Sequence, residues 1–194
     1  STILSNNSRI IIKNININKS RIGIITILKK MNCKISFKNK KIYKGEETSD
    51  IIVESSQNIK GINCPSNLNS SAIDEFLVLF LVAAKAKGIS KFKNLGELNK
   101  KESPRLDIAV SFLKMLGVKV ERKKDDLKIF GNPNLKVTKK VHVKNYLKDH
   151  RVFMMSCVAG LSFGGNWKIE DKDSINTSFP TFLKLLKKLG AKIH

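Results

Sequence analysis

Cysteine, aromatic residues and long apolar runs are scarce in this sequence, and each scarcity argues against a class of protein. The cysteines are odd in number, scattered and without a CxxC pair, which argues against a disulfide framework or a zinc knuckle and favours a reducing, cytoplasmic location; they are Cys33, Cys64 and Cys157. Aromatic residues make up 7% of the chain, too few for a surface on which nucleic-acid bases stack. The longest apolar run, at 76–84, is well short of the roughly 20 residues of a membrane span. We therefore expect neither a membrane nor a nucleic acid as partner.

Acidic residues are also scarce relative to basic ones. The chain has 37 Lys and Arg against 16 Asp and Glu, which gives a formal charge of +21. A basic module that binds nucleic acid or another polyanion is therefore an alternative function, with an affinity that falls steeply as salt is added. However, Lys, Asn and Ile crowd the chain from end to end, as in IIIKNININK. The charge thus indicates a compositional bias more than a binding patch.

Arginine is rare in a chain that takes its positive charge mainly from lysine. Only five arginines are present, namely Arg9, Arg21, Arg105, Arg122 and Arg151. The planar guanidinium binds carboxylate or phosphate through two parallel hydrogen bonds, which the point charge of lysine cannot reproduce. Arg105 and Arg151 are therefore candidate anion-binding residues.

Three segments of the sequence match one another: LKKMNCKI, LKMLGVKV and LKKLGAKI. Their spacing is regular and too long for a solenoid repeat. Each segment predicts the end of a helix, a turn at Asn32, Gly117 or Gly190, and then a strand. Upstream of each lies a further strand signal and a polar loop; the strand signals are at 9–15, 90–95 and 166–171.

The common unit is therefore a strand, a loop, an amphipathic helix, a turn and a strand, which is the pattern of a βαβ crossover. Apolar runs at 73–86 and 151–163 predict second helices in the later copies. Three copies in one body predict an α/β fold with pseudo-threefold symmetry and helices packed inward, in which equivalent loops of different copies meet. The chain begins without Met on residues typical of the tail of a helix, so we expect it to be a fragment.

The loop before the second matching helix, NKKESPRL, concentrates charged side chains. Pro104 suits the first turn of a helix, and Ser103 is an acceptable N-cap. Together with free N–H groups of the helix start, Lys101 and Arg105 would form an anion site in which Glu102 exchanges a proton with the ligand. A solvated, capped helix start is the alternative that these residues leave open.

Two further helix starts carry candidate residues. In KDHRVFMM, His150 titrates near neutrality and Arg151 can bind a carboxylate at a buried helix entrance. In SSAIDEFLVLF, Asp74 and Glu75 complement the helix dipole, which is a sufficient structural explanation for both acids. A general base at the helix mouth is the functional alternative, and physical grounds alone favour neither acid.

Taken in order, the motifs resemble the C-terminal half of the 5-enolpyruvylshikimate-3-phosphate (EPSP) synthase family, the 3-phosphoshikimate 1-carboxyvinyltransferases. They are NKSRIG, GEETSDIIVESS, AIDEF, KESPRL, DHRVFMM, TSFPTF and the closing LGAKI. Each motif is weakly specific, but the ordered set runs essentially the whole length of the chain. A different enolpyruvyl transferase of this fold is a further alternative, although UDP-N-acetylglucosamine enolpyruvyl transferase, which shares the fold, lacks the KES and DHR motifs.

The resemblance implies a two-lobed enzyme, each lobe an inside-out α/β barrel of three βαβαββ units. This chain would be the single C-terminal lobe, inactive alone, with the N-terminal lobe absent and with repeats at about 1–62, 63–131 and 132–194. The implied reaction transfers the enolpyruvyl group of phosphoenolpyruvate to the 5-hydroxyl of shikimate 3-phosphate and releases phosphate. The enzyme would be a cytoplasmic monomer that uses no cofactor and no metal.

The resemblance also implies roles for the acids and the lysine. Asp74 resembles the family's acid that contacts the shikimate hydroxyls and serves as a candidate base. Lys101 resembles another contact on the shikimate side. Glu102 resembles the proton donor and acceptor at the methylene carbon of phosphoenolpyruvate.

Two cations and a histidine complete the implied site. Arg105 and Arg151 resemble the guanidinium pair that binds the carboxylate and phosphate of phosphoenolpyruvate, with His150 as a hydrogen-bonding partner. The sequence departs from the family in two places. Pro104 stands where many members have Asp, and Thr177 stands where some have a lysine, which puts a third cation in doubt.

Overall fold

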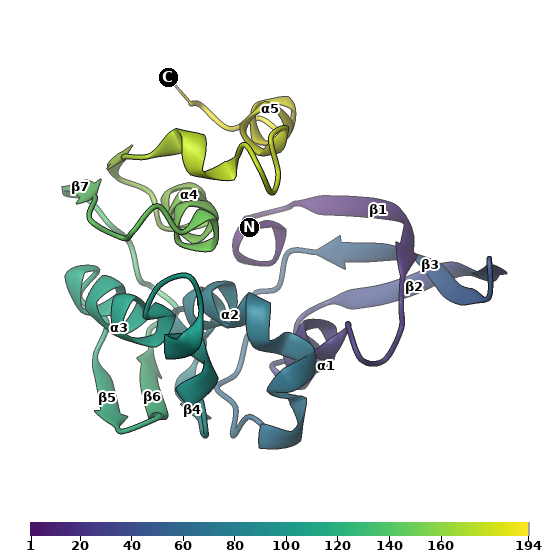
Figure 1. Ribbon diagram of the computed structural model, residues 1–194, viewed down its shortest axis with the longest axis horizontal. Coiled ribbons are helices and arrows are strands. Elements are labelled where there is room, and N and C mark those ends of the chain that lie inside the picture. Colours follow the sequence, from purple (N-terminus) through teal and green to yellow (C-terminus); the bar gives the residue numbers. More distant parts are fainter. Residues whose placement is uncertain (194) are drawn as a thin grey trace. The chain divides into compact units, whose positions relative to one another are not determined.

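The structure of the protein is a computed structural model that describes residues 1–193. Two compact units follow each other along the chain, the first ending at Leu135 and the second beginning at Lys136 (Figure 1). The division of the chain into three repeats stays a prediction.

The first unit opens with a short 3-10 helix, η1 (Thr2–Leu4), and a three-stranded antiparallel sheet. The elements of this region are β1 (Arg9–Asn16), α1 (Gly23–Lys30), β2 (Ile35–Tyr43) and β3 (Glu46–Glu54). The strand order is β1-β3-β2, so β3 lies between its two predecessors and pairs antiparallel with both. β1 and β2 therefore run parallel to each other and are joined through α1, as the βαβ pattern predicted.

Asp50, in the middle strand β3, ties the two flanking strands to it. The pairing register shifts on both sides of β3 at this point, where Asn14 and Asn39 adopt positive φ angles of 54° and 53°. The Asn14 amide donates to Asp50 Oδ1 at 2.9 Å, and Asn39 Nδ2 donates to Oδ2 at 2.7 Å. Because these bonds favour the ionised carboxylate, the pKa of Asp50 lies below its ordinary value. One carboxylate thus stabilises two irregular strands.

A second three-stranded sheet repeats this topology later in the first unit. β4 (Gly88–Phe92), β5 (Val120–Lys123) and β6 (Asp126–Gly131) lie in the order β4-β6-β5, again with the last strand in the middle. β6 pairs antiparallel with both neighbours. The 3-10 helix η4 (Gly96–Lys100) and α3 (Arg105–Met115) connect β4 to β5. The first two matching segments therefore belong to equivalent parts of two like motifs.

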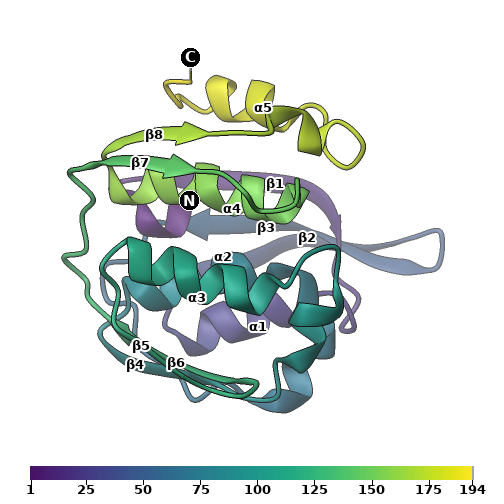
Figure 2. The same cartoon turned by 60° about the vertical axis from the view of Figure 1, so that its left-hand side comes forward.

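α2 (Phe76–Ala84) lies at the core of the first unit, where it packs against α1, α3 and β6 (Figure 2). A helix that is apolar on every side is expected to be buried, and all but one of its residues are. The rings of Phe76, Phe80 and Phe92 pack with centroids 5.1, 5.7 and 5.9 Å apart. The helix predicted at 73–86 is confirmed. Among residues 1–193, every helix is too short or too polar to span a lipid bilayer.

The second unit contains one further crossover. β7 (Lys140–Val143) and β8 (Asn166–Ile169) pair in parallel, which requires the crossover connection that α4 (His150–Phe163) provides. Figure 2 shows α4 beside these two strands. The 3-10 helix η5 (Lys172–Ile175) and α5 (Phe182–Lys188) follow. The second helix predicted for this copy is confirmed.

The three predicted turns share one backbone conformation. Asn32, Gly117 and Gly190 have φ angles of 67°, 80° and 93°, the left-handed conformation that commonly ends a helix. Strands β2 and β5 follow the first two turns as predicted. The strand predicted after the third turn is not found among residues 191–193, so that part of the prediction is wrong. A strand needs a partner for its backbone groups, and among the described residues β8 pairs with β7 alone.

Candidate active site

Arg105, the first residue of α3, is the centre of a charged cluster in the first unit. Only 3% of its side chain is exposed. Its NH1 lies 3.5 Å from Asp74 Oδ1, and its NH2 lies 3.5 Å from Glu102 Oε2. A buried charge requires ionic or hydrogen-bonding partners, and two carboxylates from separate segments supply them here.

Asp74 reaches Arg105 from the segment that leads into α2. This segment consists of two 3-10 helices, η2 (Ser66–Leu68) and η3 (Ser70–Glu75). Ala72 on one side of Asp74 and Phe76 on the other are fully buried, which fixes the turn between them. The Asp74 side chain is 36% exposed, so it remains accessible while it pairs with the buried guanidinium.

Glu102 and Lys101 lie in the short loop between η4 and α3. The Glu102 side chain is 57% exposed and Lys101 is exposed beside it. Glu102 precedes Arg105 by three residues, and the bend at 101–103 brings the acid to the guanidinium. The loop therefore presents an accessible acid between one buried cation and one exposed cation.

The start of α3 differs by one residue from the prediction. The helix begins at Arg105 with Pro104 at the N-cap, so the interpretation of Ser103 as the cap is wrong. Proline has no side-chain oxygen that could accept from the first amides of the helix, and the structure shows no side-chain cap at this position.

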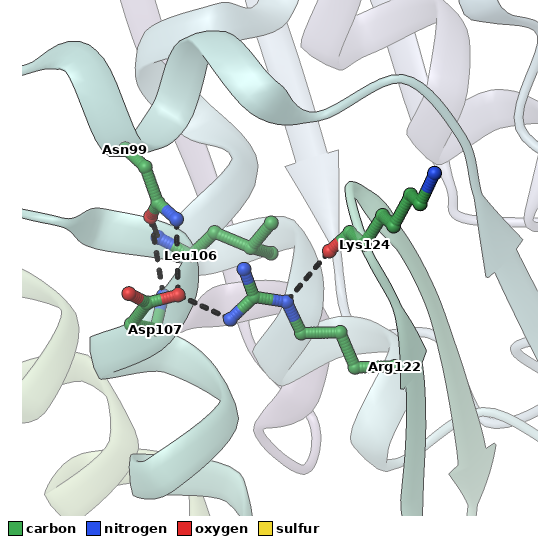
Figure 3. Close-up of polar contacts among 5 residues, drawn as sticks. All are labelled: Asn99, Leu106, Asp107, Arg122 and Lys124. Atoms are coloured by element: carbon green, nitrogen blue, oxygen red, sulfur yellow. Dashed lines mark hydrogen bonds and ion pairs between the residues drawn. The ribbon is translucent and has the colours of Figure 1, made fainter.

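The backbone amides of this helix start are bonded within the protein. The Arg105 amide donates to Ser103 O at 2.7 Å. The amides of Leu106 and Asp107 donate to Asn99 Oδ1 at 2.9 and 3.3 Å (Figure 3). The predicted contribution of free N–H groups to an anion site is therefore wrong, and side chains would bind an anion here. The sequence reasoning also missed Asn99, whose role depends on contacts seven and eight residues away.

His150 and Arg151 begin α4 in the second unit, as predicted. Asp149 is the N-cap, and its Oδ1 accepts from the Arg151 amide at 2.9 Å. Asp149 is only 1% exposed, whereas His150 and Arg151 are partly exposed. The helix entrance is thus buried at its cap and open at the two candidate side chains. The signal for this cap was present in the sequence, because aspartate directly before an apolar helix is a common N-cap.

The structure brings three of the six predicted site residues together, namely Asp74, Glu102 and Arg105. Lys101 neighbours Glu102 in the same loop. The remaining two candidates lie in the second unit and are adjacent on α4. That the loops of different copies meet stays a prediction.

The three cysteines are free and chemically quiet. Burial raises the pKa of the Cys33 thiol to about 12, that of Cys64 to about 11 and that of Cys157 to about 12. Because the thiolate is the nucleophile and the metal ligand, protonated thiols of this kind suit neither role.

Comparison with solved structures places the fold among enolpyruvyl transferases. The crystal structure of the enolpyruvyl transferase NikO from Streptomyces tendae matches the whole chain and 41% of its own length, with a TM-score of 0.71. At 14% sequence identity this similarity shows the fold alone, and it confirms the predicted fold class.

Sequence comparison narrows the class to one family. A family model described as EPSP synthase (3-phosphoshikimate 1-carboxyvinyltransferase) matches residues 2–186. The 3-phosphoshikimate 1-carboxyvinyltransferase of Zymomonas mobilis is 40% identical over 190 residues, which are 96% of this chain and 42% of that protein. The Bacillus subtilis enzyme of the same name is 35% identical over 186 residues, which are again 96% of this chain and 42% of that protein. The chain belongs to the EPSP synthase family, as its motifs predicted.

A solved structure of this family agrees closely with the fold. EPSP synthase from Acinetobacter baumannii matches the whole chain with a TM-score of 0.91 and 31% identity, over 44% of its own length. The chain thus spans about two fifths of the length of the curated relatives it matches.

Proposed function

We propose that this chain is the C-terminal lobe of an enzyme that transfers the enolpyruvyl group of phosphoenolpyruvate to the 5-hydroxyl of shikimate 3-phosphate. Membership of the EPSP synthase family supports the reaction class. The observation that carries the proposal is the buried Arg105, held between the accessible acids Asp74 and Glu102. A reaction that joins two anions and moves protons needs such a fixed cation with acids beside it.

The proposed reaction is an addition followed by an elimination. In the addition, the methylene carbon of phosphoenolpyruvate gains a proton, and the 5-hydroxyl attacks the adjacent carbon while a base takes the hydroxyl proton. In the elimination, the bond from that carbon to the phosphate oxygen breaks and the new methyl group loses a proton. Glu102 is the proton donor and acceptor at the methylene carbon, and Asp74 contacts the shikimate hydroxyls as candidate base.

The cations bind and screen the anionic groups. Arg105 and Arg151 bind the carboxylate and phosphate of phosphoenolpyruvate, His150 adds a hydrogen bond, and Lys101 contacts the shikimate side. A guanidinium has five N–H donors in a fixed planar fork, which suits it to bind a carboxylate or phosphate between acidic neighbours.

The proposed enzyme requires a second, N-terminal lobe that supplies the rest of the shikimate 3-phosphate site. The share of its relatives that this chain spans supports this requirement. We place the enzyme in the cytoplasm as a monomer without cofactor or metal, a location with which three free, protonated thiols are compatible.

Phosphate release tests the proposal. The full-length enzyme and this chain alone are each supplied with phosphoenolpyruvate and shikimate 3-phosphate. We expect release by the full-length enzyme and none by the chain. An inactive full-length enzyme would contradict the function, and an active chain would contradict the need for a second lobe.

A further inference from the structure

The loop that carries Lys101 and Glu102 enters α3 through a proline, which cannot cap the helix with its side chain. Pro104 occupies the N-cap with ψ of 73°, and no side chain caps the helix from that position. The first amides of α3 after Arg105 instead donate to a residue upstream of the loop, Asn99.

Asn99, directly before this loop, forms hydrogen bonds with the residues directly after it and so joins the two ends of the loop. Its Oδ1 accepts from the amides of Leu106 and Asp107 at 2.9 and 3.3 Å, and its Nδ2 donates to Asp107 Oδ1 at 2.9 Å. Figure 3 shows the amide side chain of Asn99 pointing at these groups. The neighbouring Leu98 is fully buried, which anchors η4 beneath Asn99. One side chain thus joins the last turn of η4 to the first turn of α3.

Arg122, on β5, ties this closure to the second sheet. Its NH1 pairs with Asp107 Oδ1, and its Nε donates to Lys124 O at 2.8 Å (Figure 3). The guanidinium therefore donates from two separate nitrogens to two acceptors, whereas a lysine would have a single nitrogen for both. Asn99, Asp107 and Arg122 form one continuous network.

The network acts unequally on the two site residues that it encloses. Arg105 has 3% of its side chain exposed and pairs with Asp74 outside the loop, so burial and this pair hold it when the loop is released. Glu102 is 57% exposed and lies in the loop itself. Release of the loop would therefore displace Glu102 far more than Arg105.

We propose that Asn99 is a positioning residue that keeps Glu102 directed at the reacting carbon by closing the loop at 100–105. The inference rests on the function proposed above, in which Glu102 carries the proton. A proton is transferred in the transition state, whereas substrate anions are bound mainly by the arginines. Loss of Asn99 therefore lowers kcat and leaves KM nearly unchanged.

The test compares Asn99→Ala with the unchanged full-length enzyme. We expect kcat to fall roughly ten- to hundredfold, as for a small misplacement of a catalytic group, while KM for both substrates changes less than about threefold. Hydrogen exchange of the peptide that covers residues 100–108 reports the closure directly, and its amides should exchange faster in the variant. Asn63→Ala, an exposed asparagine elsewhere in the first unit, is the matched control.

A conservative variant separates positioning from general stability. Asn99→Asp retains an oxygen that can accept from the amides of Leu106 and Asp107, loses only the donor to Asp107, and leaves the Arg122–Asp107 pair in place. We expect it to retain slow exchange and to keep kcat within about threefold of the unchanged enzyme.

The outcomes are distinguishable. If Asn99→Ala exchanges faster but keeps a normal kcat, the positioning role is overturned and the proposed function stands. If its amides exchange at the unchanged rate, the positioning role is likewise overturned. A loss of kcat that matches the loss of folded protein in a thermal melt, or that is equally large in Asn99→Asp, also overturns it. An unchanged enzyme that releases no phosphate overturns the proposed function, and with it this inference.

Discussion

The helices α3 and α4 begin in different ways although each carries proposed site residues in its first turn. α4 is capped by the residue directly before it, since Asp149 accepts from the Arg151 amide. α3 follows Pro104, which has no capping group, and its first amides bond to Asn99. A cap on the residue directly before a helix fixes the helix start alone. A capping residue further upstream, such as Asn99, also fixes the loop between itself and the helix.

The difference matters because the two starts have different proposed tasks. The α4 start presents Arg151 and His150 for binding, and a fixed helix end suffices for that role. The α3 start also presents Glu102 from a loop, and a proton donor must be placed more accurately than a binding charge. We therefore expect the same change to have unequal effects at the two positions.

The largest expected effect comes from replacing each arginine by lysine in the full-length enzyme. Arg105→Lys should lower kcat/KM roughly a hundredfold, because a buried two-pronged donor with two acid partners is lost; Arg151→Lys, at a partly exposed position, should lower it about tenfold. Phosphate-release kinetics measure both. Arg9→Lys, at an exposed pair with Glu54, is the control and should leave kcat/KM unchanged. Near-normal kinetics for Arg105→Lys would refute its assigned role.

A smaller effect is expected from removing the local cap of α4. Asp149→Ala should lower the free energy of unfolding by about 1–2 kcal/mol, because a buried capping carboxylate is lost. Asp149→Asn keeps an oxygen that can accept from the Arg151 amide and should retain most of this stability. Urea unfolding of the full-length enzyme measures both variants. Equal destabilisation by Ala and Asn would show that the charge, and not the acceptor, stabilises the helix start.

The smallest effect concerns pH and the network at α3. Hydrogen bonds from Arg122 and then from Asn99 lower the pKa of Asp107 below its ordinary value of 3.8. A lowered carboxyl pKa contributes stability that is fully present above the ordinary value and is lost as the pH falls through the lowered one. The unfolding free energy of the unchanged enzyme should therefore fall more steeply below about pH 4 than that of Asp107→Asn. Parallel pH profiles would mean that the network does not favour the ionised form.

Local signals in the sequence predicted much of the fold. The turns at Asn32, Gly117 and Gly190 followed from residues that tolerate positive φ, and the structure confirms all three. The buried helix α2 followed from an uninterrupted apolar run. These features depend on a few neighbouring residues, so the sequence displays them directly.

Features that depend on distant partners were missed. Ser103 was a reasonable cap by its type, but the helix starts one residue later and uses Asn99. Because proline also suits the first turn of a helix, no local signal showed that Pro104 would stand at the cap or that Asn99 would provide the acceptor. Arg122, one of only five arginines, likewise indicated a site that needs a two-pronged donor, although its partner Asp107 could be found only in the folded chain.

The strand order of the first unit also determines when each sheet can form during synthesis. In both sheets the strand made last lies in the middle, so the earlier two have no contact with each other as neighbours. During synthesis on the ribosome, β1 gains a partner in its sheet only after β3 (residues 46–54) has been made. Likewise, β4 gains its partner only after β6 (residues 126–131) has been made. The nascent chain therefore completes the two sheets of the first unit in separate events, each triggered by the synthesis of a final strand.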